Sequence, residues 1–580
     1  MMRLLSRFPR PLGIAVMLAC GLSVQALGAD ATYRVVARTG QFAPGGGFFS
    51  SFGAPVISAN GRVAFPGSVI GVLNHRGVWS EGVTGMNNLA SVIRRNDPIP
   101  GVNGTFVGSL EFPPCIMNRT GELAFIVPIT GAQAAFGQWA LLKHDANGVH
   151  TVAAPGKLVS LPCGGLGCQR WITGIATGTY AFNATSQVAF AAGLDGTAVN
   201  PDNNEVVLLS DGVTTDVVMR KGDVAPTTAS SLFTTFAISL LQLNDNGVVL
   251  TRNFLNDPNS NTAVWSAWRG HPGAMSLVAR QGDPTPLGEP FGGGFLSFGE
   301  MAINNAGQTL FLQDAVNNLG DARRGLWRNA GGATQTMCLQ GMPSPTGFNY
   351  LRPEGARASI NPDGVMAYTA TIQGPGINLA NDTVIVRRLS NGVESLVVRE
   401  GDQAPGLPNG VVFFNPGFTG QMILDDRRVI FRSLLSGPGI HEGNRDTLWI
   451  SRNGAPPALL IRTGQMMAVD GPIKTVQDFT VALSAGSESG TRSGVSQLGQ
   501  VALRVVFTDD TEAIIVASAV SACPGDVNGD GVVDFLDLNA VLSGFGHIGD
   551  VVDADLDLDG DVDFMDLNAV LSHYGVQCEL

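Results

Sequence analysis

The sequence predicts a mainly β protein, an eight-bladed β-propeller closed by its N-terminal strand, with a small α-helical domain after it. Three observations predict this fold. Gly accounts for 75 of the 580 residues and Pro for 32, which is typical of short strands joined by tight turns. A short motif recurs at intervals of about 60 residues, the size of a four-stranded blade. The last part of the chain breaks this pattern and carries a different, acidic repeat.

Residues 1–29 are predicted to be a signal peptide. Three arginines precede an uncharged apolar stretch from Leu12 to Leu27, and small residues follow where a signal peptidase cleaves. We therefore expect an exported protein, secreted or associated with the cell surface. No later apolar stretch approaches the roughly 20 residues that cross a bilayer. An alternative is lipid attachment at Cys20, because residues 17–20 loosely match a bacterial lipoprotein signal.

Residues 30–520 are predicted to form the propeller from a motif of the form Asn-x-x-Gly-x-x-Ala-Phe. Asn-x-x-Gly is a turn signal, and the alternating apolar residues after it predict a strand. Successive copies are 57 to 65 residues apart, except for the last interval of 72. The clear copies are MNRTGELAF (117–125), FNATSQVAF (182–190), LNDNGVVLT (243–251), INNAGQTLF (303–311) and INPDGVMAY (360–368), and the weaker ones are ISANGRVAF (57–65), ILDDRRVIF (423–431) and VSQLGQVAL (495–503).

Each repeat also contains a strand that ends in Arg-x-Gly-Asp or a related sequence. This element already occurs at VVARTGQFAP (35–44), ahead of the first motif, and the last repeat lacks it. The N-terminal strand is therefore predicted to complete the last blade and to remove the open edges of the ring. A linear stack of repeats is the alternative.

The Arg and Asp of this element allow two interpretations. They could form a ring that binds an anionic sugar, or they could brace a turn and bridge adjacent blades. We favour the second interpretation because the pairs recur regularly, whereas binding sites usually break repeat symmetry. The pairs are Arg220/Asp223, Arg280/Asp283 and Arg399/Asp402.

The acidity of the chain is concentrated at its C-terminal end. The whole chain has 35 Lys and Arg against 48 Asp and Glu, a formal charge of −13. Residues 523–580 alone contain 13 acidic residues and no Lys or Arg, so the rest of the chain is neutral. This excludes a nucleic-acid-binding protein, which needs a basic face.

The acidic region contains two copies of one sequence, at 526–546 and 555–575. Each copy places oxygen ligands at the spacing of a twelve-residue calcium loop, with Gly531 or Gly560 at the sixth position, where the chain turns around the ion. The sequence therefore predicts two bound Ca²⁺ ions. The ligands are Asp526, Asn528, Asp530, the carbonyl of Val532, Asp534 and Asp537 in the first loop, and Asp555, Asp557, Asp559, the carbonyl of Asp561, Asp563 and Asp566 in the second.

A short amphipathic helix is predicted after each loop. Apolar residues recur at helical spacing, and Gly546 and Gly575 follow as C-terminal stops. The apolar residues are Leu538, Val541, Leu542 and Phe545 in the first helix, and Leu567, Val570, Leu571 and Tyr574 in the second.

Residues 521–580, with these two loop–helix repeats, resemble a type I dockerin. The resemblance implies calcium-dependent folding and docking onto a cohesin module, in assemblies that degrade plant polysaccharides. Dockerins commonly contact their partner through a polar pair at the tenth and eleventh loop positions. Here those positions hold Phe535-Leu536 and Phe564-Met565, which we expect either to form an apolar docking face or to pack on the propeller.

Export implies an oxidising environment, in which disulfides form. Cys523 and Cys578 are the only cysteines of the acidic region, and a disulfide between them would join its ends. Cys163 and Cys168 lie in one Gly-rich segment and could also pair. Cys115 and Cys338 lie in strand-like segments and are expected to be buried free thiols. A zinc site is the alternative, but no His stands at ligand spacing from a Cys pair.

Most of residues 31–520 resembles bacterial secreted or surface proteins that carry tandem NxxGxxAF repeats and exchangeable C-terminal anchoring modules. This resemblance implies an exported scaffold and no known catalytic activity. The leading hypothesis is a secreted, calcium-binding, non-catalytic propeller, attached by its C-terminal domain to a cohesin-type partner or a cell-surface assembly. One alternative is a polysaccharide-degrading glycoside hydrolase or lyase, which needs two carboxylates converging at the channel mouth. Another is a glycan-binding propeller.

Overall fold

The computed structural model of the chain describes residues 31–576 apart from short gaps, and for 235–239 it describes the backbone alone. The predicted signal peptide, with Cys20, and four further cysteines, Cys163, Cys168, Cys523 and Cys578, lie outside the described residues. No helix in the described part of the chain is long and apolar enough to cross a membrane. The gaps are 84, 103–104, 109–113, 132–137, 160–168, 229, 257–262, 293–300, 318, 355–357, 452–455, 498, 520–524, 528–531, 548–553, 555 and 557–560.

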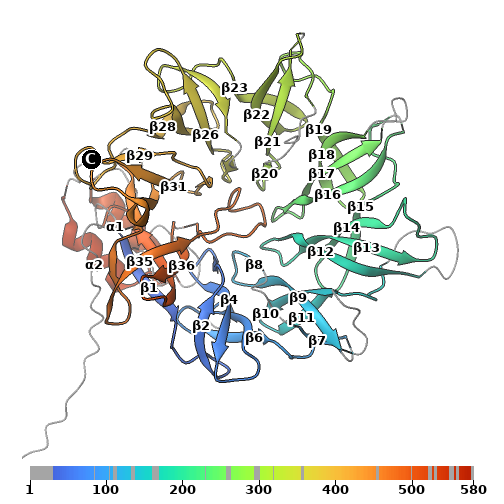
Figure 1. Cartoon of the computed structure of the whole chain (residues 1–580), viewed down its shortest axis with the longest axis horizontal. Helices are drawn as coiled ribbons and strands as arrows, with labels where there is room; N and C mark the ends of the chain where they lie inside the picture. Colours follow the sequence, from blue (N-terminus) through green and yellow to red (C-terminus); the bar gives the residue numbers. More distant parts are fainter. Residues whose placement is uncertain are drawn as a thin grey trace, which may run out of the picture.

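The chain forms an eight-bladed β-propeller, in which antiparallel sheets follow one another around a ring (Figure 1). Blade 1 contains β2 (Phe48–Phe52), β3 (Val56–Ile57), β4 (Val63–Ile70), β5 (Arg76–Ser80) and β6 (Ala90–Arg94). Blade 2 contains β7 (Thr105–Val107), β8 (Cys115–Met117), β9 (Leu123–Gly131), β10 (Trp139–Asp145) and β11 (Gly148–Ala153). Blade 3 contains β12 (Arg170–Phe182), β13 (Val188–Gly196), β14 (Glu205–Ser210) and β15 (Thr215–Arg220). Blade 4 contains β16 (Leu232–Leu243), β17 (Val249–Asn256), β18 (Ala263–His271) and β19 (Ala274–Arg280).

The second half of the ring repeats this arrangement. Blade 5 contains β20 (Met301–Ile303), β21 (Thr309–Val316), β22 (Ala322–Ala330) and β23 (Ala333–Leu339). Blade 6 contains β24 (Asn349–Pro353), β25 (Ser359–Ile360), β26 (Met366–Gln373), β27 (Thr383–Arg388) and β28 (Glu394–Arg399). Blade 7 contains β29 (Val412–Phe414), β30 (Gln421–Ile423), β31 (Val429–Ser436), the 3-10 turn η1 (Glu442–Asn444), β32 (Asp446–Ile450) and β33 (Ala458–Arg462). Blade 8 contains β34 (Met466–Ala468), β35 (Ile473–Thr480), β36 (Val501–Phe507) and β37 (Glu512–Ala519).

The N-terminal strand closes the ring, as predicted. Strand β1 (Ala31–Arg38) is antiparallel to β37, the last strand of blade 8, from the pair Ala31–Ala519 to the pair Arg38–Ala513. The first and last strands of the propeller therefore share one sheet, and the linear stack is wrong. This pairing satisfies the edge of β37 and joins the two ends of the repeat region non-covalently.

The hydrophobic core lies within and between the blades. Four tryptophans from the third strand of their blades are fully buried, and each packs edge-on against a Phe that lies in or before the first strand, as Trp268 does on Phe233 with 5.2 Å between ring centres. Side chains of neighbouring blades also share core clusters, for example Leu209 of blade 3 with Leu243 of blade 4. Successive residues of a strand point to opposite faces of the blade, so the apolar residues of each motif pack against the neighbouring blades on both sides. The four are Trp79, Trp268, Trp327 and Trp449.

The Asn of the repeated motif holds its own turn and the next blade together. In blade 4, Oδ1 of Asn244 accepts from the backbone N–H of Val248 at 2.9 Å, and its Nδ2 donates to the carbonyl of Asn304 in blade 5 at 2.9 Å. The equivalent bonds between blades form a hydrogen-bonded chain, the asparagine belt, from blade 2 to blade 7. Its other members are Asn118 to Asn183 (3.1 Å), Asn183 to Asn244 (2.9 Å), Asn304 to Asn361 (3.0 Å) and Asn361 to Leu424 (3.2 Å).

The Arg-x-Gly-Asp elements make hydrogen bonds and an ion pair within their own turns and blades, which supports a structural role for these residues. Arg280 and Asp283 form an ion pair of 2.8 Å, and Arg399 donates from Nε to the carbonyl of Asn381 at 2.9 Å. Arg220 makes the equivalent bond to a carbonyl of its own blade. The turn that follows Arg220 then exchanges two backbone hydrogen bonds with Phe233, in the first strand of the next blade.

Two short helices follow the propeller, as the loop–helix pattern predicts. They are α1 (Phe535–Gly544) and α2 (Phe564–His573). Each helix end exchanges two backbone hydrogen bonds with the opposite loop, through Val562 and Val533 respectively, so the two halves are interlocked. The described core of this unit is small. Of the apolar faces predicted for the two helices, Val541 and Val570 are buried, whereas four other residues are exposed to solvent. The buried core residues are Val533, Val541, Ala554, Val562 and Val570, and the exposed ones are Leu542, Phe545, Leu571 and Tyr574.

Candidate functional site

The centre of the ring contains a segment of the last blade, residues 481–494, which we call the channel loop. It leaves β35, extends to the middle of the propeller and returns to β36 (Figure 1, orange). It forms backbone hydrogen bonds with the first strands of several blades, including Ser489 with Leu243 of blade 4 at 3.0 Å and Ala485 with Ile360 of blade 6 at 3.1 Å. The channel loop therefore ties blades on different sides of the ring to one another.

The close approach of the channel loop to the blades depends on glycine. Gly490 has a φ of +63°, and a Cβ built there would lie 2.4 Å from the carbonyl oxygen of Leu243. A side chain at this position would clash with backbone, which cannot rotate away. Gly490 also accepts a hydrogen bond from the N–H of Phe182 in blade 3, at 2.8 Å.

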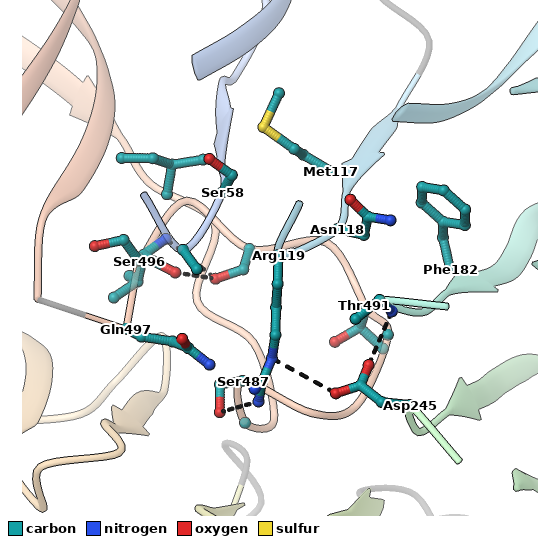
Figure 2. Close-up of a pocket in the computed structure, with 17 residues that line it drawn as sticks. Ser58, Met117, Asn118, Arg119, Phe182, Asp245, Ser487, Thr491, Ser496 and Gln497 are labelled. Carbon is teal, nitrogen blue, oxygen red and sulfur yellow. Dashed lines mark hydrogen bonds and ion pairs between the residues drawn. The ribbon is translucent and has the colours of Figure 1, made fainter. Parts of the chain in front are cut away.

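A charged cluster fixes the channel loop in place, and Figure 2 shows Arg119 and Asp245 of this cluster beside Ser487 of the loop. Arg119 of blade 2 lies 3.4 Å from Glu488 of the loop and 3.6 Å from Asp245 of blade 4. Asn305 of blade 5 donates from Nδ2 to both carboxylates, at 2.7 Å to Glu488 and 2.9 Å to Asp245. The backbone N–H of Asn305 also donates to Glu488, at 2.6 Å. Residues of blades 2 and 5 thus converge on one loop carboxylate, and both also contact Asp245 of blade 4.

Burial dominates the electrostatics of this cluster. It raises the pKa of Glu488, while hydrogen bonding from Asn305 and the charge of Arg119 oppose that rise. It also raises the pKa of Asp425 in blade 7, which accepts a hydrogen bond of 2.6 Å from the hydroxyl of Ser487. A single arginine is therefore shared among carboxylates from different parts of the chain.

Asp245 and Glu488 are a pair of neighbouring carboxylates inside the ring, the arrangement that the glycosidase hypothesis needs. Both carboxylates, however, are occupied by Arg119 and Asn305. The cavity beside Asp245 measures only about 40 Å³, against roughly 300 Å³ or more for ligand pockets. In this conformation the pair positions the channel loop and leaves no room for a sugar ring.

The structure describes part of the predicted calcium site. Asp537 is fully buried, and its two oxygens accept from the backbone N–H groups of Val527, at 2.7 Å, and Asp534, at 2.8 Å. Asp566 is also fully buried and is held in the same way by Leu556 and Asp563. In each loop the acid at the ninth position caps the helix, since Asp534 accepts from the N–H of Leu536 at 2.7 Å, and Asp563 from that of Met565 at 2.6 Å.

The remaining ligands are only partly described. Asp526, Val532 and Asp561 belong to the described residues, and each makes interactions within the structure. The described residues alone contain no group of three acidic, His or Cys side chains that could hold a metal. Five of the predicted ligands lie outside them, namely Asn528, Asp530, Asp555, Asp557 and Asp559.

The donor chemistry of this region fits Ca²⁺. Asp537 and Asp566 are carboxylates at 0% exposure in a segment that contains no Lys or Arg from 523 to 580. A buried carboxylate is costly unless a positive charge lies close to it. A hard divalent cation bound by oxygen ligands supplies that charge.

The four residues predicted to contact a partner are exposed, so they do not pack on the propeller body. They occupy the first turn of each helix, Phe535 and Leu536 in α1, and Phe564 and Met565 in α2. The ring of Phe564 meets that of Phe545 edge-on, with centres 5.2 Å apart, so the start of α2 contacts the end of α1.

Sequence reasoning missed the channel loop and the residues that hold it. One signal was present: the interval between the last two motif copies is 72 residues, against 57 to 65 elsewhere. The channel loop lies within this interval, and the extra residues provide its length. Arg119, Asp245 and Asn305 carry no separate signal, because each stands inside an ordinary copy of the motif.

Most of the chain matches one family model. Residues 23–167 and 169–524 match a family of unknown function, DUF7453, and the chain belongs to that family. The match ends before the acidic repeats. A search of curated proteins finds no match.

Three solved structures are similar to parts of the chain at low sequence identity. The β-propeller domain of the Trilobed protease from Pyrococcus furiosus has 8% identity and a TM-score of 0.32, over 74% of this chain and 95% of that one. The WD40 domain of SCAP from fission yeast has 8% identity and a TM-score of 0.35, over 85% and 95%. Prolyl oligopeptidase B from Galerina marginata has 10% identity and a TM-score of 0.35, over 83% and 57%. At this identity the likeness concerns the fold alone.

Proposed function

We propose that this member of the DUF7453 family is an exported, non-catalytic propeller that is attached to a partner protein through its C-terminal pair of calcium loops. The observation that carries the proposal is the pair of fully buried carboxylates, Asp537 and Asp566, in a segment without Lys or Arg. The two halves place these residues identically, as expected for a duplicated ion site.

Calcium supplies the positive charge that allows so many carboxylates to lie together. Asp537 and Asp566 hold the ends of the loops through their backbone contacts, and Asp534 and Asp563 begin the helices. Without the ion, repulsion between the acidic side chains opposes this compact arrangement. We therefore infer that the exposed apolar surface on the helices forms only in the calcium-bound protein.

The chemistry of that surface defines the partner. Phe535, Leu536, Phe564 and Met565 present apolar side chains from two equivalent helices, within a strongly acidic segment. Large exposed apolar patches rimmed by polar residues are typical of protein-binding sites. We propose a protein partner with a complementary apolar surface, of the cohesin type, anchored in a surface assembly.

The calcium part is tested by titrating CaCl2 into the calcium-free full-length protein in a calorimeter. We expect two ions per chain. Asp537→Asn and Asp566→Asn should each remove one site and leave the other, while Glu442→Gln, at an exposed acid of the propeller, should still bind two. Binding of no calcium by the folded wild-type protein would contradict the proposal.

Docking is tested on an immobilised type I cohesin module, with and without a calcium chelator. We expect retention of the full-length protein only with calcium. The double variant Phe535→Ser/Phe564→Ser should lose retention, whereas Leu379→Ser, at an exposed apolar residue of blade 6, should keep it. Retention that is independent of calcium, or no retention, would defeat docking onto a cohesin-type module.

A further inference from the structure

A cavity of about 280 Å³ lies between the channel loop and the first strands of blades 2 to 4. It is separate from the charged cluster around Glu488 and much larger than the cavity there. Blade 3 contributes Thr179 and Tyr180, blade 4 contributes Gln242, and the channel loop contributes Arg492. Nothing in the proposed attachment through the C-terminal helices involves this cavity.

Arg492 brings a positive charge to the cavity without a carboxylate partner among the described residues. Its Nη2 donates to the backbone carbonyl of Ala54 at 2.5 Å, which fixes the guanidinium. Its Nε is buried and has no hydrogen-bond partner in the described structure. The described residues that line the cavity include no Asp or Glu. A fixed guanidinium with free donors is the group that proteins use to bind carboxylates.

Two buried polar side chains complete the cavity wall. The Nε2 of Gln242 donates to the carbonyl of Met301 at 2.6 Å, so the amide oxygen Oε1 is the atom left without a partner in the described structure. The hydroxyl of Thr179 is likewise buried and unpaired there. The two residues are 4% and 6% exposed. A buried polar atom without a partner destabilises a fold, so a bound water or ligand is expected beside these atoms.

The three groups define one kind of ligand. Arg492 offers donors to an anion, whereas Oε1 of Gln242 can only accept and therefore requires a hydroxyl or amine donor. The cavity volume is near the lower end of small-molecule pockets. We propose that this cavity binds a small hydroxy-carboxylate, a sugar acid, with its carboxylate on Arg492 and its hydroxyl groups on Gln242 and Thr179.

The proposal is tested by calorimetric titration of the full-length protein with D-galacturonate and D-gluconate as probes. D-galactose serves as the uncharged comparison and acetate as the carboxylate without hydroxyl groups. We expect saturable binding of at least one sugar acid and at least about tenfold weaker binding of galactose and acetate. No binding of either sugar acid, or equal binding of galactose or acetate, would overturn the proposal.

Variants separate the cavity from other sites. Arg492→Gln should weaken binding of the sugar acid at least about tenfold, and Thr179→Val, which keeps the side-chain volume, should weaken it several-fold without unfolding the protein. Arg352→Gln changes an exposed arginine of blade 6 and should leave binding unchanged. Unchanged affinity in Thr179→Val and in folded Arg492→Gln would place the ligand elsewhere. Competition by a galacturonate oligomer shows whether the bound sugar acid is a free acid or the end of a polysaccharide chain. An oligomer that competes indicates a chain end, because an internal residue of a polymer does not fit the cavity.

Discussion

The side-chain amide of Asn244 donates to the backbone carbonyl of Asn304, 2.9 Å away, across the boundary between blades 4 and 5. Both asparagines are fully buried and occupy the same position of successive motif copies. The repeated Asn therefore does more than favour a turn. It connects each blade to the next from blade 2 to blade 7, so one residue type encodes both a local turn and the assembly of the ring.

Replacing Asn244 should destabilise the propeller. Asn244→Ala leaves the N–H of Val248 without its acceptor and the carbonyl of Asn304 without its donor, and we expect a loss of about 1–3 kcal/mol of unfolding free energy. Asn147→Ala, at an exposed turn of blade 2, should change stability by less than about 0.5 kcal/mol. Urea unfolding followed by tryptophan fluorescence measures both. Equal effects of the two substitutions would show that the belt does not stabilise the ring.

Residues close in sequence explain what could be predicted. The turn signal, the period-two alternation and the displaced Arg-x-Gly element predict the blades and the pairing of β1 with β37, and the structure confirms both. The channel loop could not be predicted, because Glu488 meets Asn305 across 183 residues and Ser487 meets Arg119 across 368. The long last interval indicates extra chain, but only the closed ring brings these partners together.

The C-terminal helices show a second limit of sequence reasoning. Helical spacing groups Leu538, Val541, Leu542 and Phe545 on one face, and such a face is normally read as core. In the structure Val541 is buried, whereas Leu542 and Phe545 are exposed. Two short helices enclose little volume, so periodicity identifies the apolar face but not which part of it another protein covers.

Ring closure should depend on the buried side of β1. Ala37 is fully buried and pairs with Ile514, whereas Thr32 of the same strand is exposed. Ala37→Asp places a charge without a partner in the core between blades 8 and 1, and we expect a loss of at least about 3 kcal/mol of unfolding free energy. Thr32→Asp should have little effect. Urea unfolding of the two variants tests this prediction, and we expect a lower midpoint for Ala37→Asp than for Thr32→Asp. Similar midpoints would contradict a stabilising role for β1.

The buried state of Glu488 should appear as a pH dependence. Because burial raises its pKa, Glu488 binds its proton more tightly in the folded than in the unfolded protein. Its contribution to stability is therefore greatest at low pH and falls as the pH rises from the ordinary glutamate value, about 4.3, through the raised pKa. Glu488→Gln cannot titrate. The stability of the wild type relative to this variant should decline across that window.

Unfolding free energies measured at a series of pH values test this prediction. The matched control is Glu442→Gln, since the Glu442 side chain is 89% exposed. A wild-type advantage that increases with pH would show that the ion pair with Arg119 outweighs burial, the reverse of the direction expected here.

Cys115 and Cys338 should be unreactive in the folded protein, because both are buried. Burial raises the pKa of Cys115 to about 12, with a smaller opposing effect from Arg492, and burial also raises the pKa of Cys338. The thiolate is the reactive form, so in the folded protein at pH 8 both cysteines remain in the unreactive thiol form. Iodoacetamide at pH 8 should therefore leave both cysteines unmodified in the native protein and label both in guanidinium chloride, as mapped by mass spectrometry. Labelling of Cys115 at the rate of the unfolded chain would show that blade 2 opens freely, and would contradict the closed packing between blades 1 and 2 that buries this residue.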